Sequence, residues 1–313
     1  MASKITIIGA GSVGSTIAYT MAVNGITSEV VLIDINKDKA YGEAMDIRQG
    51  TPFCSPITIY AGDYSDSAGS DIVIITSGLP RKPGQSRIDL AQNNVNIIKD
   101  IAGKVVKYAP DAMYILVSNP VDILTYAFIK QSGLPYNQVI GSGTTLDTAR
   151  LRSKLSDIYS VNQKNIHAYV MGEHGDSSFI PWSIANIAGI SLDEYSKITV
   201  EGKKISLNTE EISDYVKTSG GKIISCKGVT NFAIAVSVAR ICECLYYSKD
   251  TVMTVSTMMQ GEFGIEDVCL SFLSVVGNGC KKGNITPPLN DSEIEKLRHS
   301  ANVLKEIIKG MEF

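Results

Sequence analysis

A glycine-rich turn between a short apolar run and a helical pattern constrains the fold more than any other stretch. The run KITIIG (4–9) leads into GAGSVG, which places Gly9, Gly11 and Gly14 at the spacing G-x-G-x-x-G. Glycines at this spacing allow a tight turn, close approach of the backbone to a pyrophosphate, and close packing of the helix on the strand. The free N–H groups at the start of that helix favour an anion. The turn therefore predicts a dinucleotide-binding unit.

A carboxylate at the end of the next apolar run identifies the dinucleotide. Asp34 ends EVVLID (29–34), 20 residues after Gly14. A carboxylate at this point binds the ribose hydroxyls and repels a 2′-phosphate, so NAD is favoured over NADP. The alternative is a glycine turn followed by an unrelated surface aspartate.

Short runs rich in Ile and Val alternate with helical patterns through the first half of the chain. Such runs are typical of strands buried on both faces, and the alternation implies right-handed crossovers. The pattern predicts an α/β fold with a doubly wound parallel sheet of the Rossmann type. The expected strands are 4–9, 29–34, 57–62, 71–78, 113–119 and 138–143, and the expected helices are 12–24, 37–48, 88–107 and 120–132.

The second half is less regular and predicts a mixed α+β substrate domain. HAYVMGEHGD (167–176) begins with a strand-like run, and an amphipathic helix is expected over about 291–311. Residues 191–222 indicate only mixed helix and polar turns. We place the domain boundary near 145, which assigns 1–145 to an NAD-binding domain and 146–313 to a catalytic domain.

Composition excludes several classes of function. The 313-residue chain has a net charge of −3, so it has no overall basic field for nucleic acid. No apolar stretch approaches the roughly 20 residues that span a bilayer. The first residues lack the layout of a signal peptide, which predicts a cytoplasmic protein. The six cysteines are scattered without metal-ligand spacing, so we expect reduced thiols and no metal site.

Candidate catalytic side chains are few, because the chain has three histidines. His174 lies in MGEHGD at the end of an apolar run, where a turn can present the imidazole to a cleft. In TLDTARLRSKL (145–155), a helix would place Asp147 and Arg150 on one face. An aspartate beside a histidine favours the imidazolium, and an arginine offers a planar fork to a carboxylate. Taken from the helix alone, Asp147 and Arg150 could equally form a surface ion pair.

Several motifs in order resemble the lactate/malate dehydrogenase family over nearly the whole chain. They are GAGSVG, SNPVDILTY (118–126), IGSGTTLDTARLR (140–152), GEHGDSS (172–178) and KGVTNFAIA (227–235). The resemblance implies an NAD-dependent L-2-hydroxy acid dehydrogenase acting on a small 2-oxo or 2-hydroxy acid. It also implies a homo-oligomer, either a dimer or a tetramer. A non-enzymatic NAD-binding protein is a remote alternative.

The resemblance assigns roles residue by residue. His174 is the expected proton donor and acceptor, oriented by Asp147, and Arg150 is expected to bind the substrate carboxylate. Arg87 is expected to polarise the carbonyl from a loop that closes over the site. Asn119 and Thr230 are expected to line the substrate pocket, and Asn119 is also expected to contact the cofactor.

The basic loop LPRKPGQSR (79–87) departs from the lactate dehydrogenase pattern. Lactate dehydrogenases typically carry Gln six residues before the catalytic loop arginine, where this chain has Arg81, as malate dehydrogenases do. An unpaired, desolvated arginine would cost about 3–5 kcal/mol. We therefore predict oxaloacetate and L-malate as substrates, with pyruvate and L-lactate as the alternative. The plainest alternative is that the loop is merely solvated.

A second anion site is a further implication of the resemblance. Arg152 and His167 match positions that bind fructose 1,6-bisphosphate in many bacterial lactate dehydrogenases. On a helix, Arg152 is rotated by about 200° from Arg150 and so must serve something other than the active site. The alternative is an inherited interface pair that binds no effector.

Overall fold

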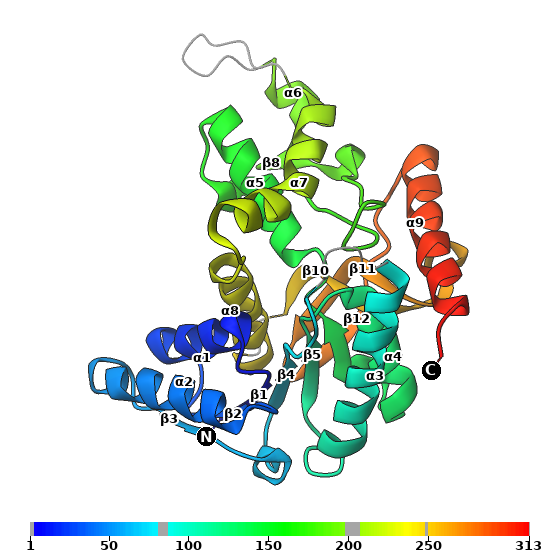
Figure 1. Cartoon of the computed structure of the whole chain (residues 1–313). Coiled ribbons are helices and arrows are strands. Elements are labelled where there is room, and N and C mark those ends of the chain that lie inside the picture. The colour runs from blue at the N-terminus through cyan, green and yellow to red at the C-terminus, as the bar shows by residue number, and fades with distance from the viewer. Residues whose placement is uncertain (1–2, 81–86, 198–206, 248–249, 313) are drawn as a thin grey trace.

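The computed structural model describes residues 3–80, 87–197, 207–247 and 250–312, with the side chain of Arg87 outside that description. Its centre is a nine-stranded sheet in the order β12-β11-β10-β6-β5-β4-β1-β2-β3, with helices on both faces (Figure 1). The strands of this sheet are β1 (Lys4–Ile8), β2 (Glu29–Ile33), β3 (Thr58–Ala61), β4 (Ile72–Ile75), β5 (Met113–Leu116), β6 (Val139–Gly141), β10 (Thr251–Gln260), β11 (Glu266–Gly277) and β12 (Cys280–Asn284). The helices are α1 (Ser12–Asn24), α2 (Lys37–Gly50), α3 (Arg87–Val105), α4 (Val121–Ser132), α5 (Thr145–Tyr159), α6 (Leu192–Tyr195), α7 (Thr209–Lys227), α8 (Phe232–Tyr246) and α9 (Asp291–Lys309).

The first six strands form the predicted doubly wound sheet. Neighbours in the order β3-β2-β1-β4-β5-β6 all pair in parallel. This order reverses between β1 and β4, which places a crevice at the carboxyl ends of these strands. The predicted α/β fold is confirmed.

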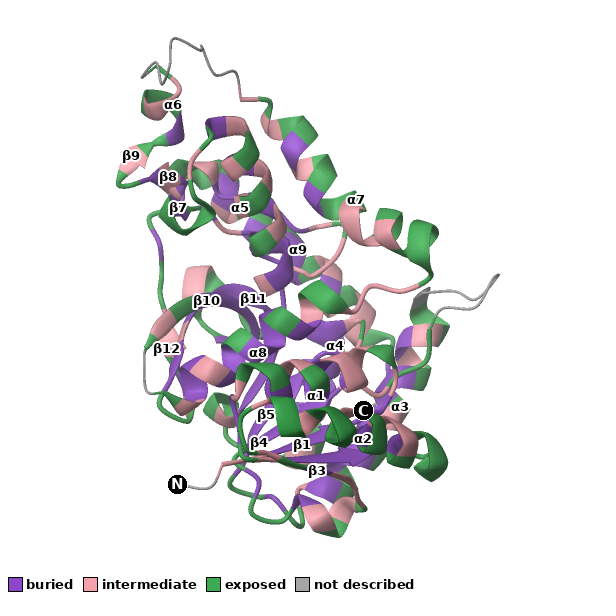
Figure 2. Cartoon of the chain, turned by 90° about the vertical axis from the view of Figure 1, so that its left-hand side faces the viewer, coloured by how far each residue is buried: buried purple, intermediate pink, exposed green. Residues whose placement is uncertain are grey.

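Side chains alternate between the two faces of the sheet, as strand geometry requires. In β2, Val30 and Leu32 belong to the core that α1 and α8 cover, whereas Val31 and Ile33 belong to the core under α3, α4 and α9. Figure 2 shows the strands buried in the middle and the exposed residues on the outer faces of the helices. Both faces are therefore apolar, which explains the near-continuous apolar runs in the sequence.

The second half of the chain continues the same sheet. Strand β10 pairs with β6 in antiparallel orientation through Ser256 and Gly141, and β11 and β12 follow. A separate core joins α5 and α7 to a small sheet of β7 (Ile166–His167), β8 (Asn186–Ile187) and β9 (Ile190–Ser191). One sheet thus includes strands from both sides of residue 145. The domain boundary near 145 stays a prediction.

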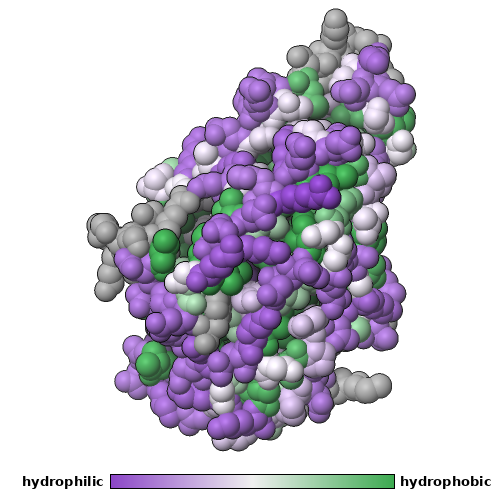
Figure 3. Space-filling model, turned by 90° about the vertical axis from the view of Figure 1, so that its right-hand side faces the viewer, coloured by the Kyte–Doolittle hydropathy of each residue, from purple (hydrophilic) through white to green (hydrophobic). Residues whose placement is uncertain are grey.

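The C-terminal helix packs as its apolar stripe predicts. Leu297, Ala301 and Leu304 of α9 are buried against the sheet, and the helix ends at Lys309, two residues before the expected end. The face of the molecule that carries α9 is mostly hydrophilic at its surface, with hydrophobic side chains scattered between the hydrophilic ones (Figure 3). Within the described ranges, no helix is long and apolar enough to cross a membrane.

Candidate active site

The predicted site residues gather at the carboxyl edge of the parallel strands. The glycine turn follows β1, Asp34 follows β2, and Asn119 follows β5. The loop after β6 leads into α5, which carries Asp147 and Arg150. Because parallel strands end at the same edge, these loops meet in the crevice where α/β sheets bind their ligands.

The glycine turn has the close packing that a dinucleotide site requires. Gly9 has φ of 109°, and a Cβ there would lie 2.6 Å from the Thr76 hydroxyl. A Cβ on Gly14 would lie 1.8 Å from the carbonyl oxygen of Gly9, so the first turn of α1 presses directly on the loop. A Cβ on Gly11 meets no atom within 4 Å. The open space at Gly11 leaves room for a pyrophosphate beside the N-terminus of α1.

Asp34 ties the end of β2 to this turn. Its Oδ2 accepts a hydrogen bond from the Ala10 N–H at 2.7 Å, and its Oδ1 accepts one from the Asn36 N–H at 2.9 Å. The carboxylate is half-buried, so its remaining lone pairs can still accept from ribose hydroxyls. The turn and Asp34 together fit NAD.

A histidine, an aspartate and an arginine form the polar centre of the candidate site. The Asp147 carboxylate contacts the Nδ1 of His174 at 2.6 Å through one oxygen and the Nη1 of Arg150 at 2.8 Å through the other. The side chains of Asp147, Arg150 and His174 are 10%, 13% and 28% exposed. The alternative of a surface ion pair is therefore wrong, because Asp147 and Arg150 are largely buried around one shared carboxylate.

Charge and burial compete at this centre. Burial alone would lower the pKa of His174, but the carboxylates of Asp147 and Asp122 outweigh it and raise the pKa. Burial opposes ionisation of Asp147, yet His174 and Arg150 outweigh it and hold the pKa of Asp147 low. The arrangement favours an imidazolium whose Nδ1 is occupied by Asp147, so the Nε2 is left for a substrate.

Helix α7 provides the space beside Arg150. A Cβ on Gly220 would lie 3.6 Å from the Nη2 of Arg150, which places the helix backbone next to the guanidinium. Asp147 engages Nη1, and the rest of the fork stays available for a planar anion. The sequence of residues 191–222 predicts no site, so this contribution of α7 is visible only in the structure.

Asn119 and Thr230 lie on segments that reach the same region. Asn119 is exposed just before α4, and the first turn of that helix contacts the loop of His174 through Asp122. Thr230 is half-buried between α7 and α8, and its neighbour Asn231 donates a hydrogen bond to the Thr16 hydroxyl of α1 at 2.9 Å. Thr230 is thereby held near the helix that follows the glycine turn.

The basic loop is only partly described. Arg81 lies outside the described residues, and Arg87 is described only as the first backbone position of α3. The described part before the loop is anchored by Asn94, which is buried in α3. Its side chain accepts from the Leu79 N–H at 2.8 Å and donates to the carbonyl of Asn119 at 2.9 Å.

The two predicted effector residues lie away from the catalytic centre. The Nε of Arg152 donates to the carbonyl of Ala168 at 3.0 Å, and its guanidinium lies 4.9 Å from the centre of the Tyr169 ring. His167 is exposed on β7, and the third histidine, His299, is exposed on α9. The role of Arg152 and His167 stays a prediction.

Two side chains that hold the loop of His174 are not among the predicted site residues. Asp122 accepts from the main-chain N–H of His174, and Ser300 of α9 accepts from the N–H of Glu173 at 2.7 Å. The available signal for Asp122 was a single aspartate within the apolar stretch PVDILTYAFI, whereas Ser300 had no distinguishing signal.

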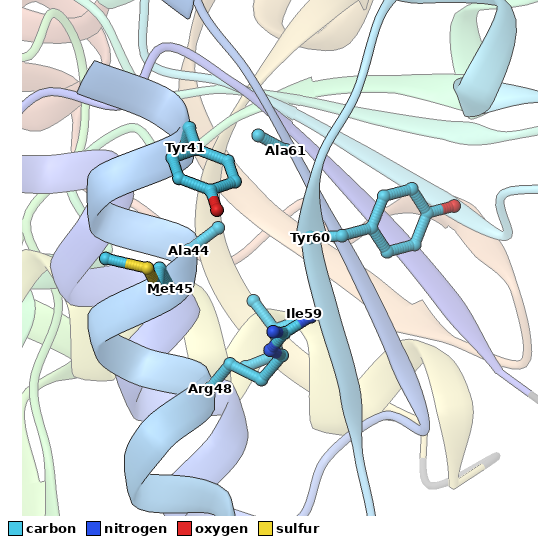
Figure 4. Close-up of a pocket in the computed structure, with 7 residues that line it drawn as sticks. All are labelled: Tyr41, Ala44, Met45, Arg48, Ile59, Tyr60 and Ala61. Atoms are coloured by element: carbon cyan, nitrogen blue, oxygen red, sulfur yellow. The ribbon is translucent and has the colours of Figure 1, made fainter. Parts of the chain in front are cut away.

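A hollow at the far edge of the sheet is separate from this site. It lies between α2 and β3 and is lined by Tyr41, Ala44, Met45, Arg48, Ile59, Tyr60 and Ala61. In Figure 4 the helix contributes Tyr41, Met45 and Arg48, and the Tyr60 ring points away from the helix. No residue of the catalytic centre lines it. Across the described residues no cluster of side chains could hold a metal ion, and the six cysteines are free.

Comparisons with known proteins agree with this geometry. The NAD binding domain of lactate/malate dehydrogenases matches residues 3–141, and the alpha/beta C-terminal domain of the same enzymes matches residues 144–313. The chain is 48% identical to an L-lactate dehydrogenase of Acetivibrio thermocellus over 99% of this chain and 97% of that protein. It is 47% identical to L-lactate dehydrogenase 1 of Clostridium acetobutylicum over 99% and 98% of the two chains.

Solved structures give the same result. A lactate dehydrogenase from a Medee basin deep-sea metagenome library superimposes with a TM-score of 0.96 at 36% identity, covering 100% of this chain and 99% of that one. The minor L-lactate dehydrogenase of Enterococcus mundtii superimposes with a TM-score of 0.95 at 34% identity and the same coverage. The chain therefore belongs to the lactate/malate dehydrogenase family and is an NAD-dependent 2-hydroxy acid dehydrogenase.

Proposed function

We propose that this enzyme interconverts pyruvate and L-lactate. The observation that carries the proposal is the shared carboxylate of Asp147, which holds His174 and Arg150 together in a chain whose relatives are named L-lactate dehydrogenases. The relatives favour the lactate alternative over the malate prediction. Arg81, on which the malate prediction depends, lies outside the described residues.

Each residue of the site has a separate role in the reaction of a 2-oxo acid. Arg150 binds the substrate carboxylate through the part of its fork that Asp147 leaves available. In the direction of reduction, the Nε2 of His174 donates a proton to the carbonyl oxygen, and in oxidation it accepts that proton. Bound NADH supplies the hydride for reduction. Arg87 polarises the carbonyl, and Asn119 and Thr230 line the pocket.

Asp147 makes this division possible because it serves two partners at once. It fixes the imidazole ring through Nδ1 and stabilises the imidazolium, so His174 enters the reduction already protonated. It also fixes Arg150 through the second oxygen, so the distance between the proton donor and the anion-binding fork stays constant. The placement of the substrate relative to His174 follows from this one carboxylate.

Replacement of His174 tests the chemistry. His174→Asn should reduce turnover of pyruvate to the background rate and leave the affinity for NADH within about threefold of the wild type, because the glycine turn is untouched. Stopped-flow fluorescence of NADH binding and steady-state rates measure the two effects separately. Retained turnover would contradict the mechanism. A wild-type chain that binds NADH but reduces no 2-oxo acid would support the remote alternative of a non-enzymatic NAD-binding protein.

A second candidate, malate dehydrogenase, is favoured by one feature of the sequence. Arg81 would pair with the second carboxylate of oxaloacetate, whereas pyruvate offers a methyl group there. The ratio of kcat/KM for NADH-linked reduction of pyruvate and oxaloacetate distinguishes the two. A higher value for pyruvate supports lactate dehydrogenase. If oxaloacetate is preferred instead, Arg81→Gln should shift the ratio toward pyruvate by roughly 100- to 4,000-fold, the equivalent of about 3–5 kcal/mol for an unpaired buried charge.

We also propose a homo-oligomer, either a dimer or a tetramer, as the family resemblance implies. In support, large apolar side chains stand exposed on helices of one side of the sheet, including Tyr19 of α1, Tyr41 of α2 and Val236 of α8 at 57%, 63% and 59%. Helix α1 contacts both α2 and α8, so these side chains lie on adjoining helices, and exposed apolar surface that gathers in one area commonly marks a protein–protein interface. Light scattering after size-exclusion chromatography gives the mass of the assembly, and a monomer at micromolar concentration would contradict the proposal.

A further inference from the structure

A second carboxylate holds His174, at its main chain rather than at its ring. Asp122 is 2% exposed and lies in the first turn of α4, where every residue from Val121 to Ile129 is buried. Burying an ionisable carboxyl among apolar side chains is costly unless specific hydrogen bonds satisfy it. Apolar packing alone therefore does not explain why an aspartate occupies this position.

Both oxygens of Asp122 have defined donors. The Oδ2 accepts from the main-chain N–H of His174 at 2.7 Å, and the Oδ1 accepts from the Ser256 hydroxyl at 2.5 Å. Ser256 lies on β10 at the position that pairs with Gly141 of β6. Asp122 thus joins α4 and the central sheet to the loop that carries the imidazole. Its place near the N-terminus of α4 further favours a negative charge.

His174 is consequently held twice, from two different elements. Asp147 of α5 contacts its ring, and Asp122 of α4 contacts its backbone. A ring held only through Nδ1 could still swing with its loop, whereas a fixed main-chain atom sets the position of Cα as well. We propose that Asp122 is a positioning residue that fixes the backbone of His174 and supplies a second negative charge beside the imidazole. This inference rests on the proposed function.

The charged groups around Asp122 and His174 determine whether Asp122 raises or lowers the pKa of His174. Asp147 and Arg150 face His174 from α5, and Asp122 faces it from α4. Burial raises the pKa of Asp122 to about 6, because the hydrogen bonds from Ser256 and His174 offset it only in part. The nearby charge of Glu173 raises that pKa further, and the thiol of Cys269 also lies within electrostatic reach. Above about pH 6, Asp122 is therefore ionised and favours the imidazolium.

The variant Asp122→Asn separates charge from geometry. An amide of the same shape can accept from the His174 N–H through its oxygen and donate to the Ser256 hydroxyl through its nitrogen. Both contacts then survive and only the charge is lost. We expect the pKa of His174 to fall by about one unit, the size of effect that a charge within about 6 Å produces. At a pH above the pKa of His174 in both proteins, the variant should reduce pyruvate about tenfold more slowly than the wild type. Near pH 6, where His174 is protonated in both, its rate should stay within about threefold of the wild type.

Two readouts measure this shift. The first is the pH profile of kcat/KM for pyruvate reduction, whose fall at high pH should begin about one unit lower in the variant. The second is an NMR titration of the imidazole signals without substrate, which is simple because the chain has three histidines. His174→Asn identifies the signal of His174 by its loss. The titration stays informative even if pyruvate is not the substrate, so failure of the proposed function and failure of this inference are distinguishable.

A matched control removes one contact and keeps the carboxyl group. Ser256→Ala deletes the hydroxyl donor to Asp122, so it should lower the melting temperature and raise the pKa of Asp122 itself, while the pKa of His174 measured above that range should fall by less than half as much as in Asp122→Asn. An unchanged pKa of His174 in Asp122→Asn, with only the melting temperature lowered, would show that Asp122 is merely structural and would overturn the inference.

A further measurement covers the case in which Asp122→Asn does not fold. His174→Asn keeps the main-chain N–H that Asp122 accepts but has no titrating ring at that position. The amide signal at position 174 should then move with an inflection near or above pH 6, which reports the ionisation of Asp122. A flat titration of that amide would overturn the inference.

Discussion

The substitution Asp147→Asn tests the centre of the mechanism most directly. An amide has one acceptor oxygen, so if that oxygen accepts from the Nη1 of Arg150, its NH2 faces the Nδ1 of His174 and can pair only with a neutral ring, not with the imidazolium. Breaking one partner from a buried pair costs about 3–5 kcal/mol, which corresponds to a loss of roughly 100- to 4,000-fold in kcat/KM at 1.4 kcal/mol per factor of ten. Because 28% of the His174 side chain is exposed, water offsets part of this loss. We therefore expect the lower end, about 100-fold.

The pH dependence of the rate of Asp147→Asn independently tests the direction in which the pKa of His174 shifts. In the wild type the raised pKa of His174 keeps the imidazolium present to higher pH, so the rate of reduction persists there. Without the Asp147 charge the pKa falls, and the loss of rate with rising pH should begin at lower pH. The assay is kcat/KM for pyruvate reduction from about pH 6 to 9, together with NADH binding, which should be unchanged.

A control for this experiment lies on the same helix. Asp157 is exposed on α5, and Asp157→Asn makes the same chemical change away from the catalytic centre, so its rates should match the wild type. If Asp147→Asn stays within about threefold of the wild type across this range of pH, the shared carboxylate does not position His174 and Arg150, and the reasoning is refuted.

Further predictions concern the cofactor turn, the loop of His174 and the second anion site. Gly14→Ala places a Cβ 1.8 Å from the Gly9 carbonyl oxygen, so the turn must shift and the Kd for NADH should rise about tenfold or more, and an unchanged Kd would contradict the assigned turn. Ser300→Ala leaves the partly buried N–H of Glu173 without its acceptor and should lower the free energy of unfolding in urea by about 1 kcal/mol; a loss below about 0.5 kcal/mol would mean that another group satisfies the N–H. Fructose 1,6-bisphosphate should lower the KM for pyruvate in the wild type and not in Arg152→Gln if the second anion site is functional, and a titration that changes neither KM nor the sedimentation profile would favour an interface pair without effector.

Strong local patterns made the first half of the fold predictable. The buried strands of the parallel sheet are near-continuous apolar runs, and the glycine turn and Asp34 lie where two of these runs end. The pair of Asp147 and Arg150 follows from helical spacing, but its burial does not, because α7 and the loop of His174 cover it from distant parts of the sequence.

The elements that were harder to predict carry weaker local signals. Helix α7 contains Ser219, Gly220 and Gly221, which are poor helix formers, and few of its residues are buried. The glycine that weakens the helical pattern is the one that leaves space for Arg150. Asp122 meets Ser256 across 134 positions of sequence, so no local pattern reveals that the two side chains are partners.

The pairing of β10 with β6 has a consequence for how far the two halves of the enzyme can be separated. A fragment that ended near residue 145 would keep the whole glycine turn and Asp34, yet it would expose β6 as an open edge whose Val139 and Ile140 are fully buried in the intact chain. An unprotected apolar edge strand pairs readily with other chains. We therefore expect the cofactor-binding half to aggregate when it is expressed alone. A chimaera that moves this half into another enzyme to transfer its cofactor specificity would have to include β10 and β11 as well.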